Sequence, residues 1–301
     1  MMKRVFIIGN GFDLNLGWKT GYWNFIESPY CPIKDSHSPL ALFLRQKTEI
    51  DRWYDLEAIL REYASEGHEI DGHITNPCKK DEDFFNELRY DLAAYLRKEM
   101  EKEVNKESVA AKVLYAVVDS GLFTSIYTFN YTDLRRVARQ LGIHKDFTYA
   151  SVHGSVEANS IILGIEDKTN IRKGYSFLRK VFSEYYKSHP IRYDLQDCGE
   201  VVFFGHSLGD NDYPYFKDFF KAQSQCIKRG NSKRITIITK DNRSRVQILE
   251  QLRLMNDCET ERLMNDNDFH FIMTDSQDQS ELNAFIQHLN SEKNRRHIRI
   301  V

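Results

Sequence analysis

The sequence predicts an α/β protein with a mostly parallel, doubly wound sheet and helices on both faces. Three observations predict this fold class. Apolar runs rich in β-branched and aromatic residues recur along the 301-residue chain, and several end in glycine or polar residues, as buried parallel strands do. Segments with apolar residues at steps of three or four separate these runs, which is the spacing of amphipathic helices. Alternation of such strands and helices requires βαβ crossovers, and these build parallel sheets.

The first predicted strand, residues 4–8, ends in a glycine-rich turn formed by Gly9, Asn10, Gly11, Phe12 and Asp13. Glycine suits a nucleotide loop because a side chain would hold the backbone away from a bound phosphate. A helix after such a turn points its free N–H groups at the anion. The full fingerprint is G-x-G-x-x-G, whereas the third glycine here is Gly17. The segment therefore fits either a nucleotide loop or a plain turn after a core strand.

A long helical stretch separates this strand from the next strand pattern, which begins at residue 123. Helices are predicted there at 38–48, 51–65, 81–104 and 106–118. Because these segments carry their own apolar stripes, we expect a helical insertion at about residues 30–118 within a single α/β domain of residues 1–301. We expect the insertion to lie over the mouth of the sheet, where it could close a pocket or form a homo-oligomer contact.

The rest of the chain continues the alternation of strands and helices. Strands are predicted at 123–129, 147–152, 160–164, 201–205, 234–239 and 269–273. Helices are predicted at 174–187, from Asp212 onward, at 241–256 and at 279–290. Pro214 falls in the first turn of the helix that starts at Asp212, where its missing N–H costs nothing.

Polar residues follow three further predicted strands. Asn130 follows 123–129, His153 follows 147–152, and a third group follows 201–205. That third group contains Gly205, His206, Ser207, Asp210 and Asp212. In doubly wound sheets, ligands bind outside the carboxyl ends of the strands. Each segment alone is an ordinary turn, but together they predict one crevice that they share with the first glycine-rich turn.

These segments, in this order, resemble the AbiH family of bacterial phage abortive infection proteins. The resemblance rests on Gly9-Asn10-Gly11-Phe12-Asp13 with Gly17, Thr128-Phe129-Asn130-Tyr131-Thr132, His153-Gly154 and Gly205-His206-Ser207-Leu208-Gly209-Asp210. The segment Trp53-Tyr54-Asp55-Leu56-Glu57 is similar to the helical insertion of that family. The resemblance covers nearly the whole chain and implies a role in antiviral defence.

The same layout is similar, at greater distance, to the Rossmann-like, sirtuin-type NAD-binding fold. That resemblance implies NAD as substrate or ligand, with Asn130 and His153 as the catalytic pair. It implies nucleotide contacts from Gly9, Asn10, Gly11, Phe12, Asp13, Gly205, His206, Ser207, Asp210 and Asp212. The paired cysteines of the sirtuin zinc module are missing from the sequence, so protein deacylation is not expected. Asp13 replaces a small polar residue of the sirtuin loop, and we expect it to accept a hydrogen bond from a ribose hydroxyl.

The chemistry of the two predicted catalytic residues suits cleavage of an N-glycosidic bond. Nicotinamide leaves as a neutral molecule from a cationic glycoside, so the enzyme must mainly hold the ribose and deliver a water. The amide of Asn130 can both donate and accept, and so can orient that water or the ribose hydroxyls. His153 can take a proton near neutral pH. We therefore predict an NAD or related nucleotide hydrolase.

Two alternatives remain open at this point. A non-catalytic nucleotide-binding sensor would have the same fold but would not need Asn130 and His153. A serine hydrolase would use Ser207, which lies in a G-x-S-x-G motif, with His270 and either Asp241 or Asp257. We favour it least, since His270 lies in an apolar run. Trp53 and Glu57 are spaced to share a helix face, and we expect a core anchor beside a surface carboxylate.

Composition bounds the partners and the compartment. The formal net charge is −2, from 42 basic and 44 acidic side chains, so nothing steers the chain towards nucleic acid or anionic lipid. The five cysteines are scattered and never form a C-x-x-C pair, which argues for a reducing compartment and against a zinc site. No apolar run approaches the length of a membrane span. We expect a cytoplasmic protein that binds a nucleotide and no metal.

Overall fold

The computed structural model describes residues 2–50, 55–65, 69–70, 73–74, 79–225 and 231–300. The chain divides into two compact units. Unit 1 comprises the residues up to Trp18, then Glu103–Val152, then the residues from Ser188 onward. Unit 2 comprises Lys19–Lys102 and His153–Lys187. Trp53 lies outside the described residues.

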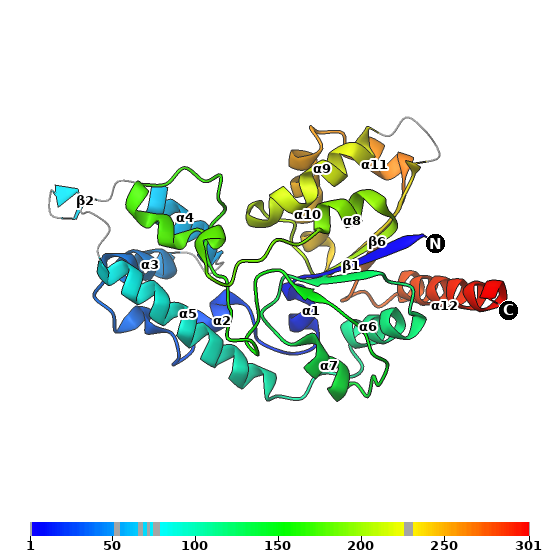
Figure 1. The fold of residues 1–301 in the computed structure, drawn as a ribbon, viewed down its shortest axis with the longest axis horizontal. Helices are drawn as coiled ribbons and strands as arrows, with labels where there is room; N and C mark the ends of the chain where they lie inside the picture. Colours follow the sequence, from blue (N-terminus) through cyan, green and yellow to red (C-terminus); the bar gives the residue numbers. More distant parts are fainter. Residues whose placement is uncertain are drawn as a thin grey trace. The chain divides into compact units, whose positions relative to one another are not determined.

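Unit 1 contains a parallel sheet in the order β5-β4-β1-β6-β7-β8 (Figure 1). Its strands are β1 (Lys3–Ile8), β4 (Ser125–Thr128), β5 (Ala150–Ser151), β6 (Cys198–Phe204), β7 (Arg234–Thr239) and β8 (Asp268–Met273). From β1 the chain winds outward through β4 and β5, then restarts beside β1 with β6 and winds outward through β7 and β8. The predicted α/β class with a doubly wound parallel sheet is confirmed. The direction of winding reverses between β1 and β6, which is where such sheets bind ligands.

Helices cover both faces of this sheet (Figure 1). One layer holds α1 (Asn10–Asn15), α6 (Val109–Ser120), α7 (Leu134–Gln140) and α12 (Ser280–Ile300). The other holds α8 (Ile191–Asp197), the 3₁₀ turn η4 (Asp210–Asp212), α9 (Tyr213–Ser224), α10 (Asn242–Met255) and α11 (Thr260–Asp266). Val5 and Ile7 pack into the core on the α8 and α9 side. Phe6 and Ile8 point to the other face and are equally buried, which explains the uninterrupted apolar run of β1.

Unit 2 is mainly helical. It contains α2 (Tyr22–Ile26), η1 (Pro32–Lys34), α3 (Pro39–Ile50), α4 (Leu56–Ser65), β2 (Glu69–Ile70), β3 (His73–Ile74), α5 (Lys79–Met100), η2 (Lys173–Leu178) and η3 (Lys180–Phe182). Helix α3 packs on both α4 and α5. The segment predicted as a helical insertion, about 30–118, is divided: α3 to α5 belong to unit 2, whereas α6 belongs to unit 1.

The strand predicted at 160–164 is wrong, because these residues form a buried irregular segment of unit 2. Ile161, Ile162 and Leu163 are each 4% exposed or less, so the apolar run correctly indicated burial. Its backbone groups find partners outside a sheet: the N–H of Ile162 donates to the carbonyl of His153 at 2.9 Å, and Arg89 donates to the carbonyl of Ile161 at 3.0 Å. An apolar run therefore measured burial here, and not strand pairing.

The helix predicted at 174–187 is also wrong. The chain forms the short turns η2 and η3 instead, because Arg179 between them is extended, with φ −74° and ψ 125°. The extension lets Ile165 donate to the carbonyl of Leu178 at 2.8 Å and lets Lys180 donate to the carbonyl of Ile165 at 3.0 Å. This pairing interrupts the helix despite the helical spacing of its apolar residues. Of the strand predicted at 147–152, only Ala150–Ser151 is paired.

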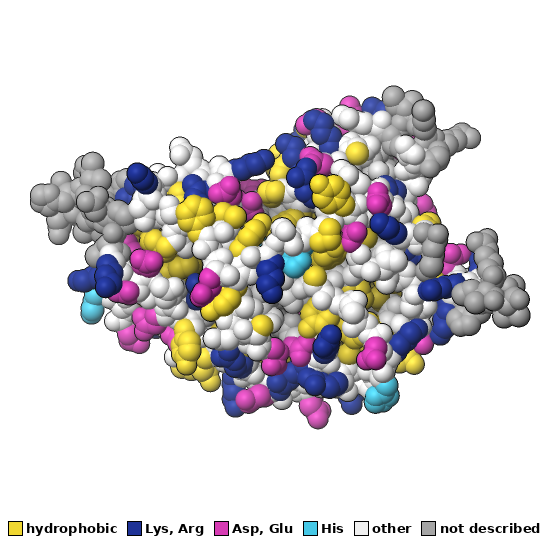
Figure 2. Space-filling view, in the orientation of Figure 1, with side chains coloured by type: hydrophobic (Ala, Val, Ile, Leu, Met, Phe, Trp, Pro, Cys, Tyr) yellow, Lys and Arg dark blue, Asp and Glu magenta, His cyan; other side chains and the backbone are white. Residues whose placement is uncertain are grey.

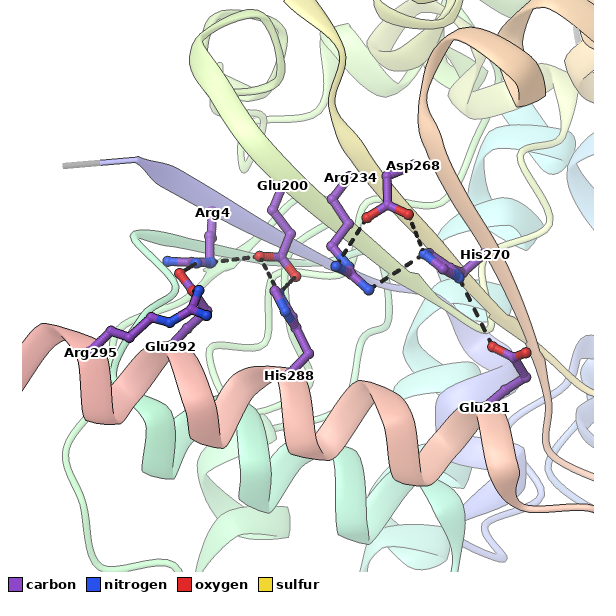
Figure 3. A network of polar contacts seen from close by, with 9 residues as sticks. All are labelled: Arg4, Glu200, Arg234, Asp268, His270, Glu281, His288, Glu292 and Arg295. Carbon is purple, nitrogen blue, oxygen red and sulfur yellow. Dashed lines mark hydrogen bonds and ion pairs between the residues drawn. The ribbon is translucent and has the colours of Figure 1, made fainter.

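A charged network joins the amino ends of the strands to α12 (Figure 3). Arg4 on β1 donates to Glu200 on β6 at 2.6 Å and to Glu292 on α12 at 2.8 Å. His288, also on α12, lies 3.2 Å from Glu200. Arg4 and Glu200 are 3% and 0% exposed. The network therefore fastens α12 across the start of the sheet.

Charges of both signs are interspersed on the face shown in Figure 2. This pattern agrees with the near balance of 42 basic and 44 acidic side chains. Among the described helices, none is both long and apolar enough to span a bilayer.

Candidate functional site

The glycine-rich turn after β1 packs directly against the turn after β6. Gly9 donates its N–H to the carbonyl of Phe204 and Gly11 donates to the carbonyl of Gly205, both at 2.9 Å. A Cβ atom on Gly9 would lie 2.6 Å from Cα of His206, and one on Gly11 would lie 2.7 Å from Cα of Gly205. Both positions therefore require glycine so that the two turns can meet at the switch point.

This packing changes the reason given for the glycines. We expected them to let a phosphate approach the backbone. In the structure, the N–H groups of Gly9, Gly11 and Phe12 all donate to carbonyls of the chain, so these three donors do not cradle a phosphate. Phe12 is fully buried and packs edge-on against Phe204, with ring centroids 5.2 Å apart. The turn is thus a rigid joint between β1 and β6.

Asp13 is buried against the turn that follows β4. It is 1% exposed, and its Oδ2 accepts a hydrogen bond from the hydroxyl of Thr132 at 2.7 Å. Burial raises the pKa of Asp13 to about 7, although hydrogen bonds from Thr132 and Asn130 oppose this rise. We expected Asp13 to accept from a ribose hydroxyl, and the hydroxyl that it accepts from is that of Thr132. A carboxyl group that titrates near neutral pH is a mark of functional sites.

Asn130 is held in the same cluster by its own side chain and backbone. Its Nδ2 donates to the carbonyl of Gly9 at 3.1 Å, and its N–H donates to the hydroxyl of Thr128 at 3.1 Å. Asn130 is 6% exposed. Its amide therefore ties the end of β4 to the turn after β1, and the predicted catalytic residue lies beside the switch point.

The turn after β6 carries His206, Ser207, Asp210 and Asp212. His206 is 4% exposed and lies edge-on to Phe129 and Phe216, with centroid distances of 4.6 and 5.0 Å. Its Nδ1 accepts from the N–H of Leu208 at 3.0 Å, which leaves Nε2 to donate towards Asp212, 3.4 Å away. His206 therefore supports this turn from within the core. Ser207 and Asp210 are exposed, and Asp212 is half-buried.

His153 belongs to unit 2, whereas Asn130 and Asp13 belong to unit 1. It is 6% exposed, as are Lys180 and Glu57. Lys180 Nζ lies 3.5 Å from Nε2 of His153 and 2.9 Å from Oε2 of Glu57. Glu57 is therefore buried in an ion pair, and the surface carboxylate that we expected at this position is wrong. The following Gly154 has φ +74°, and a Cβ there would lie 1.8 Å from the carbonyl oxygen of Ser160.

The residues proposed for a serine hydrolase do not assemble. His270 lies 2.6 Å from Asp268 and pairs with Thr236 across the sheet, in the middle of its strand. Asp241 caps α10 by accepting from the N–H of Ser244 at 2.8 Å, and Asp257 pairs with Lys221 at 2.6 Å. Each candidate partner of Ser207 thus has a separate structural contact.

Within the described residues, no group of three His, Cys, Asp or Glu side chains is placed to hold a metal ion. Two surface cavities, of about 360 and 340 Å³, share no lining residue with the strand-end turns. The first is lined by α6 and α12, the second by α2 and α5. The strand-end cluster is thus defined by its buried polar contacts.

Sequence patterns missed three residues of these clusters. Thr132 and Lys180 were not proposed, and Glu57 was expected at the surface. Thr132 lies only two positions after Asn130 in a segment that we had already identified, so its proximity to a predicted strand end was an available signal. Nothing in the local sequence indicated that Lys180 is buried.

Comparison with known proteins adds the family. A search of curated proteins found no match. A solved structure on the mechanism and regulation of Sir2 enzymes is similar over 87% of this chain and 94% of that chain, with a TM-score of 0.33 and 15% sequence identity. The family model described as bacteriophage abortive infection AbiH matches residues 5–229. That span is well over half of the chain and takes in all four strand-end turns. The protein therefore belongs to the AbiH family of bacteriophage abortive infection.

Proposed function

We propose that this protein hydrolyses the N-glycosidic bond of NAD, or of a related nucleotide, as part of abortive infection. The observation that carries the proposal is the buried cluster of Asn130, Asp13 and Thr132 beside the β1–β6 switch point. Open α/β sheets bind ligands at this place. A carboxyl group with a raised pKa, next to an amide that can both donate and accept, is the kind of arrangement found in catalytic sites.

The proposed roles follow from the contacts. Asn130 orients the ribose or the attacking water, because its amide has donors and an acceptor. Asp13 and Thr132 act as positioning residues, because Asp13 is 1% exposed and accepts from Thr132. His153 is the second proposed catalytic residue. The glycine-rich turn contributes rigidity to the site, since its N–H donors at Gly9 and Gly11 are used within the chain.

The family supports the setting of this reaction. Abortive infection stops phage production at the expense of the infected cell, and loss of a cofactor such as NAD would achieve that. Such an activity must be held off until infection. Membership of the family does not by itself specify a reaction, so the proposal rests on the chemistry of the strand-end residues.

The direct test is to incubate the purified protein with NAD and measure the release of nicotinamide. Positioned groups of this kind typically contribute about 10²–10⁴-fold to a rate. We therefore expect the Asn130→Ala and His153→Ala variants each to lower turnover by that order.

A matched control is Asn267→Ala. Asn267 is also buried and donates to two backbone carbonyls, those of Gln223 and Leu263, so its loss should lower stability while leaving turnover nearly unchanged. Near-normal turnover in both the Asn130 and His153 variants would remove the catalytic assignment. Saturable NAD binding without nicotinamide release would favour the alternative, a nucleotide-binding sensor that signals through a partner.

A further inference from the structure

Three buried polar residues meet in unit 2: Glu57 at the start of α4, Lys180 at the start of η3, and His153 after β5. Lys180 lies between the other two, 2.9 Å from Oε2 of Glu57 and 3.5 Å from Nε2 of His153. Each residue is only 6% exposed. Burying an ion pair is costly, and a hydrophobic pair of similar size is often as stable. The position of this pair against a histidine ring therefore needs an explanation beyond stability.

The contact determines which ring nitrogen of His153 carries the proton. An ammonium group has three donors and no acceptor, so Nε2 of His153 must accept from Lys180. In the neutral ring the proton then lies on Nδ1. Glu57 holds the ammonium group at this place through the ion pair. His153 therefore presents an N–H group at Nδ1, and its basic nitrogen faces Lys180.

The backbone of unit 2 places both side chains. Lys180 is positioned by the extended residue Arg179 and by its own hydrogen bond to the carbonyl of Ile165, at 3.0 Å. His153 is held by the bond from Ile162 to its carbonyl, at 2.9 Å, and by the turn at Gly154, where φ is +74°. The interruption of the predicted helix at Arg179 therefore has a result: it brings Lys180 against His153.

We propose that Lys180, anchored by Glu57, is a positioning residue that fixes the Nδ1–H tautomer of His153. His153 then acts on the ligand as a hydrogen-bond donor to a ribose hydroxyl oxygen, and not as a general base through Nε2. The ligand in this statement rests on the proposed function. The tautomer rests on the contacts of unit 2 alone.

The tautomer is tested by ¹⁵N NMR of histidine-labelled protein, with the His153 signal assigned by its loss in a His153 variant. The wild-type ring should carry its proton on Nδ1. In the Glu57→Gln/Lys180→Met double variant the proton should move to Nε2, the nitrogen that carries it in most free histidine side chains. The double variant is used because either single change would leave a buried charge or dipole without its partner. A wild-type ring protonated on Nε2, or an unchanged ring in the double variant, would overturn the role of Lys180.

The role of His153 is tested with a pair of matched substitutions. The side-chain nitrogen of asparagine can take the place of Nδ1, and that of glutamine can take the place of Nε2. A donor at Nδ1 therefore predicts that His153→Asn retains at least ~10-fold more turnover than His153→Gln, about the value of one hydrogen bond. A general base at Nε2 predicts that both variants are equally inactive, which would overturn the donor role.

The two proposals fail separately. Absence of nicotinamide release from wild-type protein would remove the proposed hydrolase, while the NMR measurement would still decide the tautomer. In that case NAD binding is compared by calorimetry. Tighter binding by His153→Asn than by His153→Gln would support the donor role, and equal affinities would overturn it.

Discussion

The two edges of the sheet in unit 1 each bury a carboxyl group, but they treat it differently. At the amino edge, Glu200 is 0% exposed and lies against Arg4 and His288 (Figure 3). At the carboxyl edge, Asp13 is 1% exposed and its hydrogen-bond partners are Thr132 and Asn130. The first carboxyl group has basic partners, whereas the partners of the second are a hydroxyl and an amide.

This difference sets the two pKa values in opposite directions. Burial raises the pKa of Glu200, but hydrogen bonds and attraction from His288 and Arg4 outweigh burial and leave it lowered. For Asp13 burial dominates, and its pKa rises to about 7. A buried carboxylate with charged partners serves as a structural clamp. A buried carboxyl group with neutral partners can change its charge near neutral pH, which is a property of functional sites.

The largest effect should come from the clamp at the amino edge. Arg4→Met would leave the fully buried Glu200 without its arginine, and removing one partner of a buried pair costs about 3–5 kcal/mol of unfolding free energy. The neighbouring Lys3→Met is the control, because Lys3 pairs with Asp197 where both side chains are largely exposed, 47% and 63%. Exposed pairs contribute about 0–1 kcal/mol. Urea denaturation at pH 7 measures both losses, and similar losses would show that the clamp has no special strength.

The next effect concerns Asp13 and depends on pH. Between the unfolded pKa of 3.8 and the folded value of about 7, the folded protein keeps a proton that the unfolded chain has lost. The contribution of Asp13 is therefore complete below the lower value and is lost as pH rises through the higher one. A shift of this size corresponds to at most ~4 kcal/mol. Asp13→Asn keeps an oxygen for Thr132 but cannot ionise, so it should gain stability over wild type as pH rises from 4 to 8.

Asp241→Asn provides the control of opposite sign. Hydrogen bonds from Ser244 lower the pKa of Asp241, so its contribution is present above the unfolded pKa and is lost as pH falls. Thermal unfolding followed from pH 4 to pH 8 distinguishes the two variants. A wild-type curve parallel to that of Asp13→Asn across this range would mean that Asp13 is not neutral in the folded protein at low pH.

Much of the sheet was predictable because its strands are buried on both faces. The predicted strand 234–239 has the bounds of β7, and 4–8 differs from β1 by one residue. The turns at the switch point were also predictable, since glycines after an apolar run indicate a close approach of backbones. The object approached is another turn of the same chain, and this depends on the pairing of β1 with β6.

The buried polar contacts could not be predicted from local patterns. Asp13 and Thr132 are 119 positions apart, and hydropathy assigns an aspartate to the surface whatever its partner. The same holds for Glu57, which begins an amphipathic helix and looks like an ordinary first-turn carboxylate. Such residues are buried because another segment supplies a hydroxyl, an amide or an ammonium group, and only the folded chain brings that segment near.

The smallest effect compares one glycine from each edge. A Cβ on Gly9, at the carboxyl edge, would lie 2.6 Å from Cα of His206, so the backbone of the neighbouring turn must shift. A Cβ on Gly199, at the amino edge, would lie 2.4 Å from Cγ and Sδ of Met2, but Met2 is exposed and its flexible side chain can turn aside. We expect Gly9→Ala to cost about 1–3 kcal/mol, the range for overpacking, and Gly199→Ala to stay within about 0.5 kcal/mol. Urea denaturation of both variants measures the difference. If the two cost the same, the turns at the carboxyl edge can move apart, and their rigidity would no longer explain how Asn130 is held beside Gly9.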